Sequence, residues 1–436
     1  MLMIMVAIVF VLAYAAIAME HPLNINKSAV ALIAAGLMWV LYSFAARSGG
    51  VVSAPLGLES VIEQLTEKLG ETAAIVFFLI GAMTIVEVID AHGGFEVMTA
   101  RIQATRVASL LWVIALLTFF LSAILDNMTT TIVMVTLMKR LLKRLDQRLY
   151  FAGIIVIAAN AGGAWSPIGD VTTTMLWIGG QITTGAIIRE LFIPSLLNML
   201  APTAVVALLL KGPVEPPEVV ENERVKTTPF EKSLMFHLGL GALIFVPIFK
   251  TVTHLPPYLG ILFSLGILWL VGELLHRYKS DEEKDPLTLT RALKRIDMAS
   301  VIFFIGILLA VSTLSANGML PTLAQWFDAK IGNQTIIVIV IGLVSAVVDN
   351  IPMVAASMGM YPLAQYPPDA FIWEFMAYCA GTGGSILIIG SAAGVAAMGI
   401  ENIQFFWYVK KIAPLALLGY VAGIVAYLVQ YQLLNG

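Results

Sequence analysis

The six residues "SAILDN" at 122–127 recur almost unchanged as "SAVVDN" at 345–350. Each copy ends a strongly apolar run and places a carboxylate, Asp126 or Asp349, directly before an asparagine. An acidic side chain inside apolar sequence is costly unless it is paired or binds something, and in membrane proteins such residues mark ion pathways and binding sites. The repeat therefore predicts two related sites, one in each half of the chain.

The composition indicates the class of protein. The chain has 436 residues, of which 59% are hydrophobic and 12% charged, with a mean hydropathy of +0.91. Apolar runs near the roughly 20 residues that span a bilayer recur along it, so we predict a polytopic membrane protein in contact with lipid, and not an enzyme. The net charge of −3 is spread over loops and gives no indication of nucleic-acid binding. The single cysteine, Cys379, and the lack of a CxxC motif predict no disulfide within the chain, no zinc and no cofactor.

The first apolar segment, residues 1–19, allows two interpretations. The letters "AIA" at 16–18 resemble the cleavage site of a signal peptide. A signal peptide also needs a basic segment before its apolar run, and the chain has none there. We therefore expect a membrane helix.

A polar, proline-containing segment, residues 212–232, divides the chain into two halves of similar pattern. We predict a first repeat at 1–211 and a second at 233–436, joined by a cytoplasmic linker. In each half we expect a re-entrant hairpin and then a broken helix. The hairpins are placed at 107–138 and 333–362, and the broken helices at 150–181 and 370–400.

Lysine and arginine residues predict the orientation. If both hairpins return to the side from which they enter, twenty of the 25 Lys and Arg residues share one side of the membrane. By the positive-inside rule that side is the cytoplasm, which leaves both termini on the opposite side. The second half is then an inverted copy of the first, as in many secondary transporters. The predicted fold is thus an all-α polytopic membrane protein with two inverted repeats, each with a re-entrant helical hairpin and an interrupted helix.

Two kinds of helix interruption are predicted to meet near the bilayer midplane. Each hairpin turn carries its aspartate, and 34 to 37 residues later each half contains paired glycines, Gly162 with Gly163 and Gly383 with Gly384. We expect these glycines, together with Pro167, to unwind the helix and free backbone carbonyls. Carbonyl, carboxylate, amide and hydroxyl oxygens suit a hard cation. The candidate ligands are Asp126, Asn127, Thr129, Thr130, Asn160, Ser166, Asp170, Thr172, Thr173, Ser345, Asp349, Asn350, Thr382 and Ser385.

Four stretches at these residues resemble a known family. "LDNMTTTIVMVTLMKRL" (125–141) and "NAGGAWSPIGDVTTTMLWIGGQIT" (160–183) are similar to the hairpin and broken-helix motifs of NhaD-type sodium/proton antiporters, in the ion transporter superfamily. "VVDNIPMVAASMGM" (347–360) and "GTGGSILIIGSAAGVAAMG" (381–399) resemble the second-half motifs of that family. The likeness runs across nearly the whole chain.

The resemblance carries expectations beyond those drawn from the residues. It implies a scaffold domain that forms a homodimer and a transport domain that contains both hairpins and moves as an elevator. It also implies exchange of cytoplasmic Na⁺ or Li⁺ for external H⁺, with a role in pH homeostasis in a bacterial inner membrane.

Two alternatives stay open. Asp126 and Asp349 could be helix caps that satisfy backbone N–H groups, and Asp170 could do the same for the half-helix that follows it. The protein could also carry an organic or oxyanion substrate such as a dicarboxylate, citrate or arsenite. Aspartates at both hairpin tips favour a cation, because they would repel an anion.

Overall fold

The computed structural model describes residues 2–19, 25–47, 58–99, 104–215, 227–347 and 349–435. Regular secondary structure within these ranges is helical, and one isolated β-bridge joins Arg106 to Pro213. Seven of the described helices are long and apolar enough to cross a bilayer. Residues 216–226 of the predicted linker lie outside the described part of the chain.

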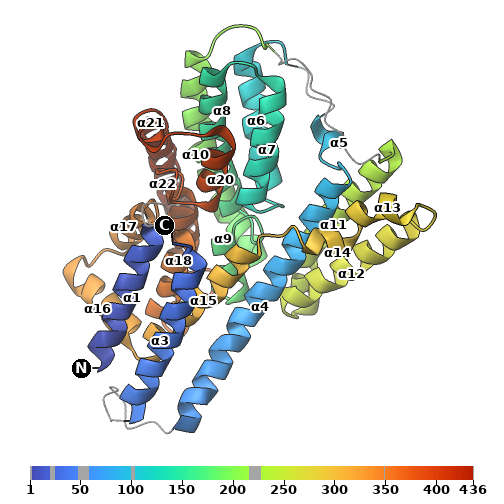
Figure 1. The fold of residues 1–436 in the computed structure, drawn as a ribbon. Coiled ribbons are helices and arrows are strands. Elements are labelled where there is room, and N and C mark those ends of the chain that lie inside the picture. Colours follow the sequence, from blue (N-terminus) through green and yellow to red (C-terminus); the bar gives the residue numbers. More distant parts are fainter. Residues whose placement is uncertain are drawn as a thin grey trace.

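The first half forms three long helices, a hairpin, a broken helix and a final long helix (Figure 1). The hairpin consists of α6 and α7, and the broken helix of α8 and α9. The bounds are α1 (Leu2–Ala18), α3 (Lys27–Arg47), α4 (Leu58–Ala91), α5 (Glu96–Thr99), α6 (Val107–Ser122), α7 (Asn127–Leu141), α8 (Leu145–Ala164), α9 (Val171–Ile178) and α10 (Thr184–Leu209).

The second half has the same order of long elements, with short helices added. Its hairpin consists of α17 and α18, and its broken helix of α19 and α20. The bounds are α11 (Pro229–Thr253), α12 (Pro257–Leu275), α13 (Asp281–Lys284), the 3₁₀ helix η1 (Asp285–Leu287), α14 (Leu289–Leu293), α15 (Met298–Ala316), α16 (Met319–Lys330), α17 (Gln334–Val344), α18 (Asn350–Met360), α19 (Phe371–Gly383), α20 (Ala392–Glu401), α21 (Phe405–Lys411) and α22 (Ala413–Asn435).

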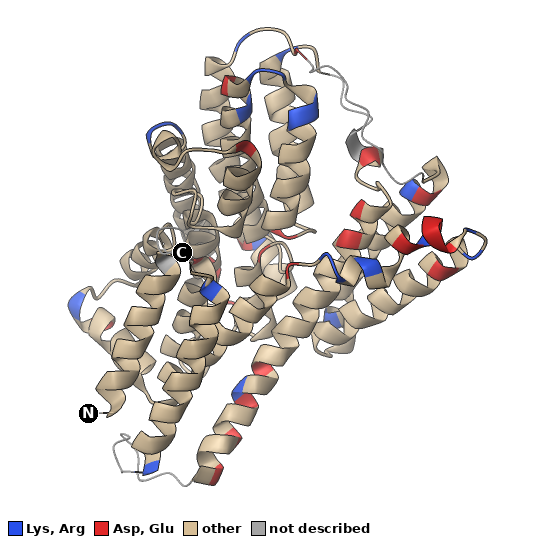
Figure 2. Ribbon diagram, viewed as in Figure 1, with Lys and Arg blue, Asp and Glu red and all other residues tan. Residues whose placement is uncertain are grey.

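The long helices pack in two sets, and each set draws on both halves of the chain. The anchor set contains α1, α3, α4, α11, α12 and α15, and the hairpin set contains α6 to α10 and α17 to α22. Helix α18 packs against α15 of the anchor set, and α9 touches α4. Charged residues gather mainly at helix ends and around α11 to α14, and long stretches of most other helices carry none (Figure 2). Apolar helix surfaces of this kind suit contact with lipid tails.

The paired glycines have a different role from the expected one. Gly162 and Gly163 lie inside α8, and Gly383 is the last residue of α19, so the prediction that these three glycines unwind the helix was wrong, whereas Pro167 does lie in the interruption between α8 and α9 and Gly384 directly follows α19. A Cβ on Gly162 would lie 2.2 Å from the carbonyl oxygen of Phe119, and a Cβ on Gly383 would lie 2.1 Å from that of Gly342. In each half, therefore, the glycine lets the first hairpin helix cross closely against the broken helix. The interruptions themselves follow the glycines, between α8 and α9 and between α19 and α20.

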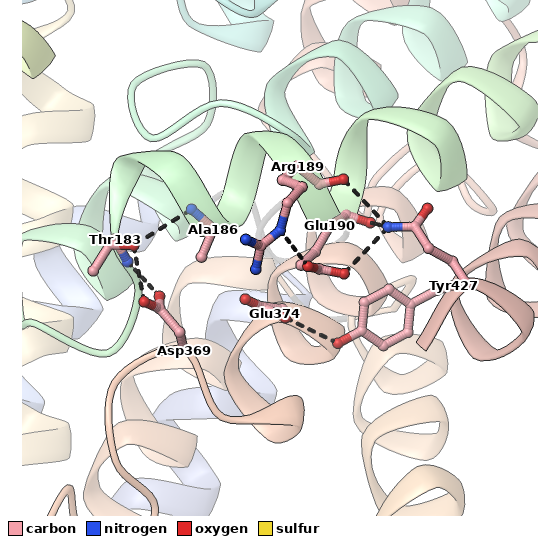
Figure 3. A network of polar contacts seen from close by, with 8 residues as sticks. Thr183, Ala186, Arg189, Glu190, Asp369, Glu374 and Tyr427 are labelled. Carbon is pink, nitrogen blue, oxygen red and sulfur yellow. Dashed lines mark hydrogen bonds and ion pairs between the residues drawn. The ribbon is translucent and has the colours of Figure 1, made fainter. Parts of the chain in front are cut away.

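A polar network joins the last helix of the first half to the second half (Figure 3). It links α10 with the loop before α19 and with α22, and it links α22 with α19. The hydrogen bonds run from Thr183 to Asp369, from Arg189 and Gln430 to Glu190, and from Tyr427 to Glu374. These contacts hold α10, α19 and α22 together within the hairpin set.

Candidate cation site

The N-termini of four short helices meet at one cavity in the middle of the protein. The cavity has a volume of about 180 Å³, and the first residues of α7, α9, α18 and α20 all line it. A helix N-terminus presents unpaired N–H groups and a partial positive charge, so each one needs an acceptor. The caps are Asp126, Asp170, Asp349 and Ser391.

The capping interpretation of the aspartates is confirmed by their geometry. Asp126 accepts the backbone N–H of Thr129 at 2.8 Å and also its hydroxyl. Asp170 accepts the N–H and the hydroxyl of Thr172, both at 2.8 Å. A cap does not require a charge, since Ser and Asn cap as well as Asp, and an ionised carboxylate has about four acceptor positions. Capping therefore leaves the carboxylates able to bind a cation.

An asparagine pair connects the hairpin tip to both broken helices. The Asn127 amide donates to Asn160 Oδ1 at 2.9 Å and to Asp170 Oδ2 at 2.7 Å. The Asn160 amide donates across to the second half, to Ser385 Oγ at 2.8 Å and Ser391 Oγ at 2.9 Å. All five side chains are buried. The network therefore fixes the positions of several oxygens, from α7, α8 and the two loops that interrupt the broken helices, around one point.

The serine of the repeated motif makes the same kind of contact in both halves. Ser122 Oγ donates to the carbonyl oxygen of Ala159 at 2.6 Å, and Ser345 Oγ donates to that of Ala380 at 3.0 Å. In both halves the serine thus ties the end of the first hairpin helix to the broken helix beside it. Ser122 was not among the predicted site residues, although the repeat itself contained the signal. Ser345 was predicted as a ligand, and its hydroxyl hydrogen is used by this bond.

Of the other predicted residues, Asn350 lines the cavity. Thr130 is fully buried in the first turn of α7, and its hydroxyl has no hydrogen-bond partner in the described part of the chain. The remaining three hydroxyls bond to backbone carbonyls: Ser166 to that of Ala123, Thr173 to that of Asp170, and Thr382 to that of Tyr378.

Asp349 has a partner that the sequence did not suggest. Lys27 Nζ, at the start of α3, donates to Asp349 Oδ2 at 3.4 Å. In the sequence, Lys27 counts only as one of the basic residues that define the cytoplasmic side.

The cavity is connected to one face of the protein. A second cavity, of about 440 Å³, shares Glu87, Thr129 and Arg295 with it and extends past Asp90 to Arg140 at the end of α7. That is the side on which the sequence places the cytoplasm. A third cavity, of about 650 Å³, is lined by other residues, among them Lys68 and Glu71 of α4.

Lys250 of α11 lies between the third cavity and α9. Its ammonium group donates to the carbonyl oxygen of Trp177 at the end of α9 and lies 4.2 Å from the centre of the Trp177 ring. The anchor set and the hairpin set are therefore in contact on the side opposite to the open cavity.

The donor atoms that converge at the hairpin tip are oxygens, and the carboxylates of Asp126 and Asp170 among them suit a hard monovalent or divalent cation. Glu87, Asp297 and Arg295 also line the cavity. Among the described residues, no group of three or more His, Cys, Asp or Glu side chains is arranged to hold a metal ion.

The fold and the site together define a multi-pass membrane transporter. The sequence matches the family described as "Citrate transporter" over residues 10–375. It is 48% identical to "Sodium/proton antiporter 1" of Arabidopsis thaliana, over 98% of this chain and 72% of that protein. It is 31% identical to "Na(+)/H(+) antiporter NhaD" of Alkalimonas amylolytica, over 96% of this chain and 89% of that protein. The chain belongs to the NhaD-type sodium/proton antiporter family.

A solved structure supports the fold independently. The YdaH transporter of Alcanivorax borkumensis aligns with a TM-score of 0.60, covering 94% of this chain and 99% of that one. At 11% identity the likeness concerns the fold alone.

Proposed function

We propose that this protein exchanges Na⁺ or Li⁺ for H⁺ across a membrane, with the cation held at the first-half hairpin tip. The observation that carries the proposal is the convergence of Asp126, Asn127, Asn160 and Asp170 on one buried site. The hydroxyls of Thr129 and Thr172, which lie against the two carboxylates, add further oxygens. The names of the sodium/proton antiporters that the chain resembles support Na⁺ and H⁺ as the transported ions.

Competition between Na⁺ and H⁺ for the same carboxylate couples the movement of the two ions. A carboxyl group that has taken up H⁺ carries no charge with which to hold Na⁺, and a bound Na⁺ disfavours H⁺ on the same oxygens. The same two aspartates can therefore carry Na⁺ in one direction and H⁺ in the other. Glu87 and Asp90 line the route from the open face, where they can pass either ion to the site.

Alternating access follows from the two sets of helices. We propose that the hairpin set moves as an elevator against the anchor set, and that the anchor set forms the contacts of a homodimer. The cavity that reaches Asp126 opens on one face, and on the other face Lys250 holds α9 against α11. This is the arrangement of an inward-open state if the basic side is the cytoplasm.

The test is made with purified protein in liposomes that carry a pH gradient, monitored with a pH-sensitive dye. NaCl or LiCl should dissipate the gradient, whereas KCl should not. The description of the matching family suggests citrate as the other candidate cargo. Uptake of labelled citrate or a dicarboxylate, without a response to NaCl alone, would establish that alternative.

A further inference from the structure

The two hairpin tips have the same cap but different donors. Thr129 lies three residues after Asp126 and offers the carboxylate both an N–H, at 2.8 Å, and a hydroxyl. The residue three positions after Asp349 is Pro352, which has neither. Asp349 accepts the backbone N–H of Ile351 instead, at the longer distance of 3.3 Å. The second-half carboxylate is thus less well satisfied by its own helix.

Lys27 supplies Asp349 with a hydrogen-bond donor that the first turn of α18 does not. Its ammonium group lies 3.4 Å from Asp349 Oδ2 and 4.7 Å from the centre of the Phe303 ring, so a carboxylate and an aromatic face both stabilise the charge. The side chains of Lys27 and Asp349 are 27% and 15% exposed. Removal of one partner of such a partly buried pair leaves the other charge uncompensated, which is costly.

The pair also joins the two sets of helices. Lys27 begins α3 of the anchor set, and Asp349 caps α18 of the hairpin set. In the described part of the chain, Tyr14 on α1 and Asp170 at the start of α9 also interact electrostatically with Asp349, and neither is a cation. Among the described residues, Lys27 is the positive group that pairs with the second-half tip in this conformation.

We propose that Lys27 is a tethered cation that occupies Asp349 in this conformation and excludes transported Na⁺ from the second-half tip. The cargo is then held by the first half alone, where Asp126 and Asp170 face the cavity. This inference rests on the proposed Na⁺/H⁺ exchange and specifies which of the two tips carries the ion.

The experiment measures binding of radioactive ²²Na⁺ to the purified full-length protein, alongside exchange in liposomes. Asp349→Asn should leave the amount of Na⁺ bound per chain unchanged, whereas Asp126→Asn should abolish binding. Lys27→Met should raise the amount bound, because Asp349 becomes free to hold a second ion, and should lower exchange by about tenfold or more. Adding Asp349→Asn to Lys27→Met should return both quantities toward the wild-type values.

Lys68→Met is the matched control, since the Lys68 side chain is 28% exposed and pairs with Glu71 at 2.8 Å away from either tip. Lys27→Gln serves if Lys27→Met does not fold. A loss of bound Na⁺ in Asp349→Asn, or no gain in either Lys27 variant, would overturn the inference. The inference would also be overturned if the double variant of Lys27→Met and Asp349→Asn exchanged ions no faster than the slower of the two single variants. If the wild-type protein and Lys68→Met neither bind Na⁺ nor exchange it, the proposed function itself fails, and this outcome is distinct from the others.

Discussion

Substitution of Asp126 by Asn separates a helix cap from a cation ligand. Asn caps a helix about as well as Asp, so the first turn of α7 should lose only a few tenths of a kcal/mol, whereas Ala would cost about 1 kcal/mol. The Thr129 N–H can still donate to the carbonyl oxygen of the asparagine amide, and the Thr129 hydroxyl, which donates to the other carboxylate oxygen in the wild type, can accept from the amide NH₂. The thermal midpoint of Asp126→Asn in detergent should therefore stay close to that of the wild type.

The effect on the cation should be far larger. Two unit charges about 4 Å apart interact by roughly 4 kcal/mol at the effective dielectric constant of about 20 that describes protein sites. Removal of the Asp126 charge should therefore weaken Na⁺ binding by about a thousandfold, since each ~1.4 kcal/mol is a factor of ten. Na⁺-dependent dissipation of the pH gradient in liposomes should be lost at any practical Na⁺ concentration.

The control is Asp146→Asn, which removes an exposed carboxylate that pairs with Arg144 at 2.8 Å near the start of α8. It should exchange like the wild type. Wild-type exchange in Asp126→Asn, with the same apparent affinity for Na⁺, would show that Asp126 is only a cap and would refute its assignment as a ligand.

Two further predictions concern the fold. Gly383→Ala should prevent stable folding, because its Cβ would lie 2.1 Å from the Gly342 carbonyl oxygen, whereas Gly36→Ala, with no atom within 4 Å, should be tolerated; size-exclusion profiles of the two variants make the comparison. His276 follows the last residue of α12, and burial together with the neighbouring His92 lowers its pKa to about 4. The folded protein keeps this histidine neutral. Its contribution to the free energy of unfolding should therefore be constant above about pH 6.5 and fall as the pH drops from there toward about 4. His276→Gln should flatten that dependence in thermal melts, and an unchanged pH dependence would contradict it.

The sequence predicted the positions of the helix interruptions better than their cause. Asp126 and Asp349 do cap the second helix of each hairpin, because an acid after an apolar run is both a capping signal and a sign of a membrane site. The role of Gly162 was misjudged, since unwinding and close backbone approach both require glycine and the sequence does not distinguish them. Lys27 could not be paired with Asp349 from the sequence, because 322 positions separate them and only the packing of α3 against α15 and of α15 against α18 brings them together.

The two halves share one arrangement of helices, but their hairpin tips differ in charge. The first half places Asp126 and Asp170 at its two helix starts, and the second half places Asp349 and Ser391 at the corresponding starts. Ser391 is neutral, and Asp349 is paired with Lys27, so these second-half caps and their partner carry no net charge in this conformation. The first half presents two carboxylates. We therefore expect a cation that enters from the open face to be drawn to the first-half tip rather than to the second.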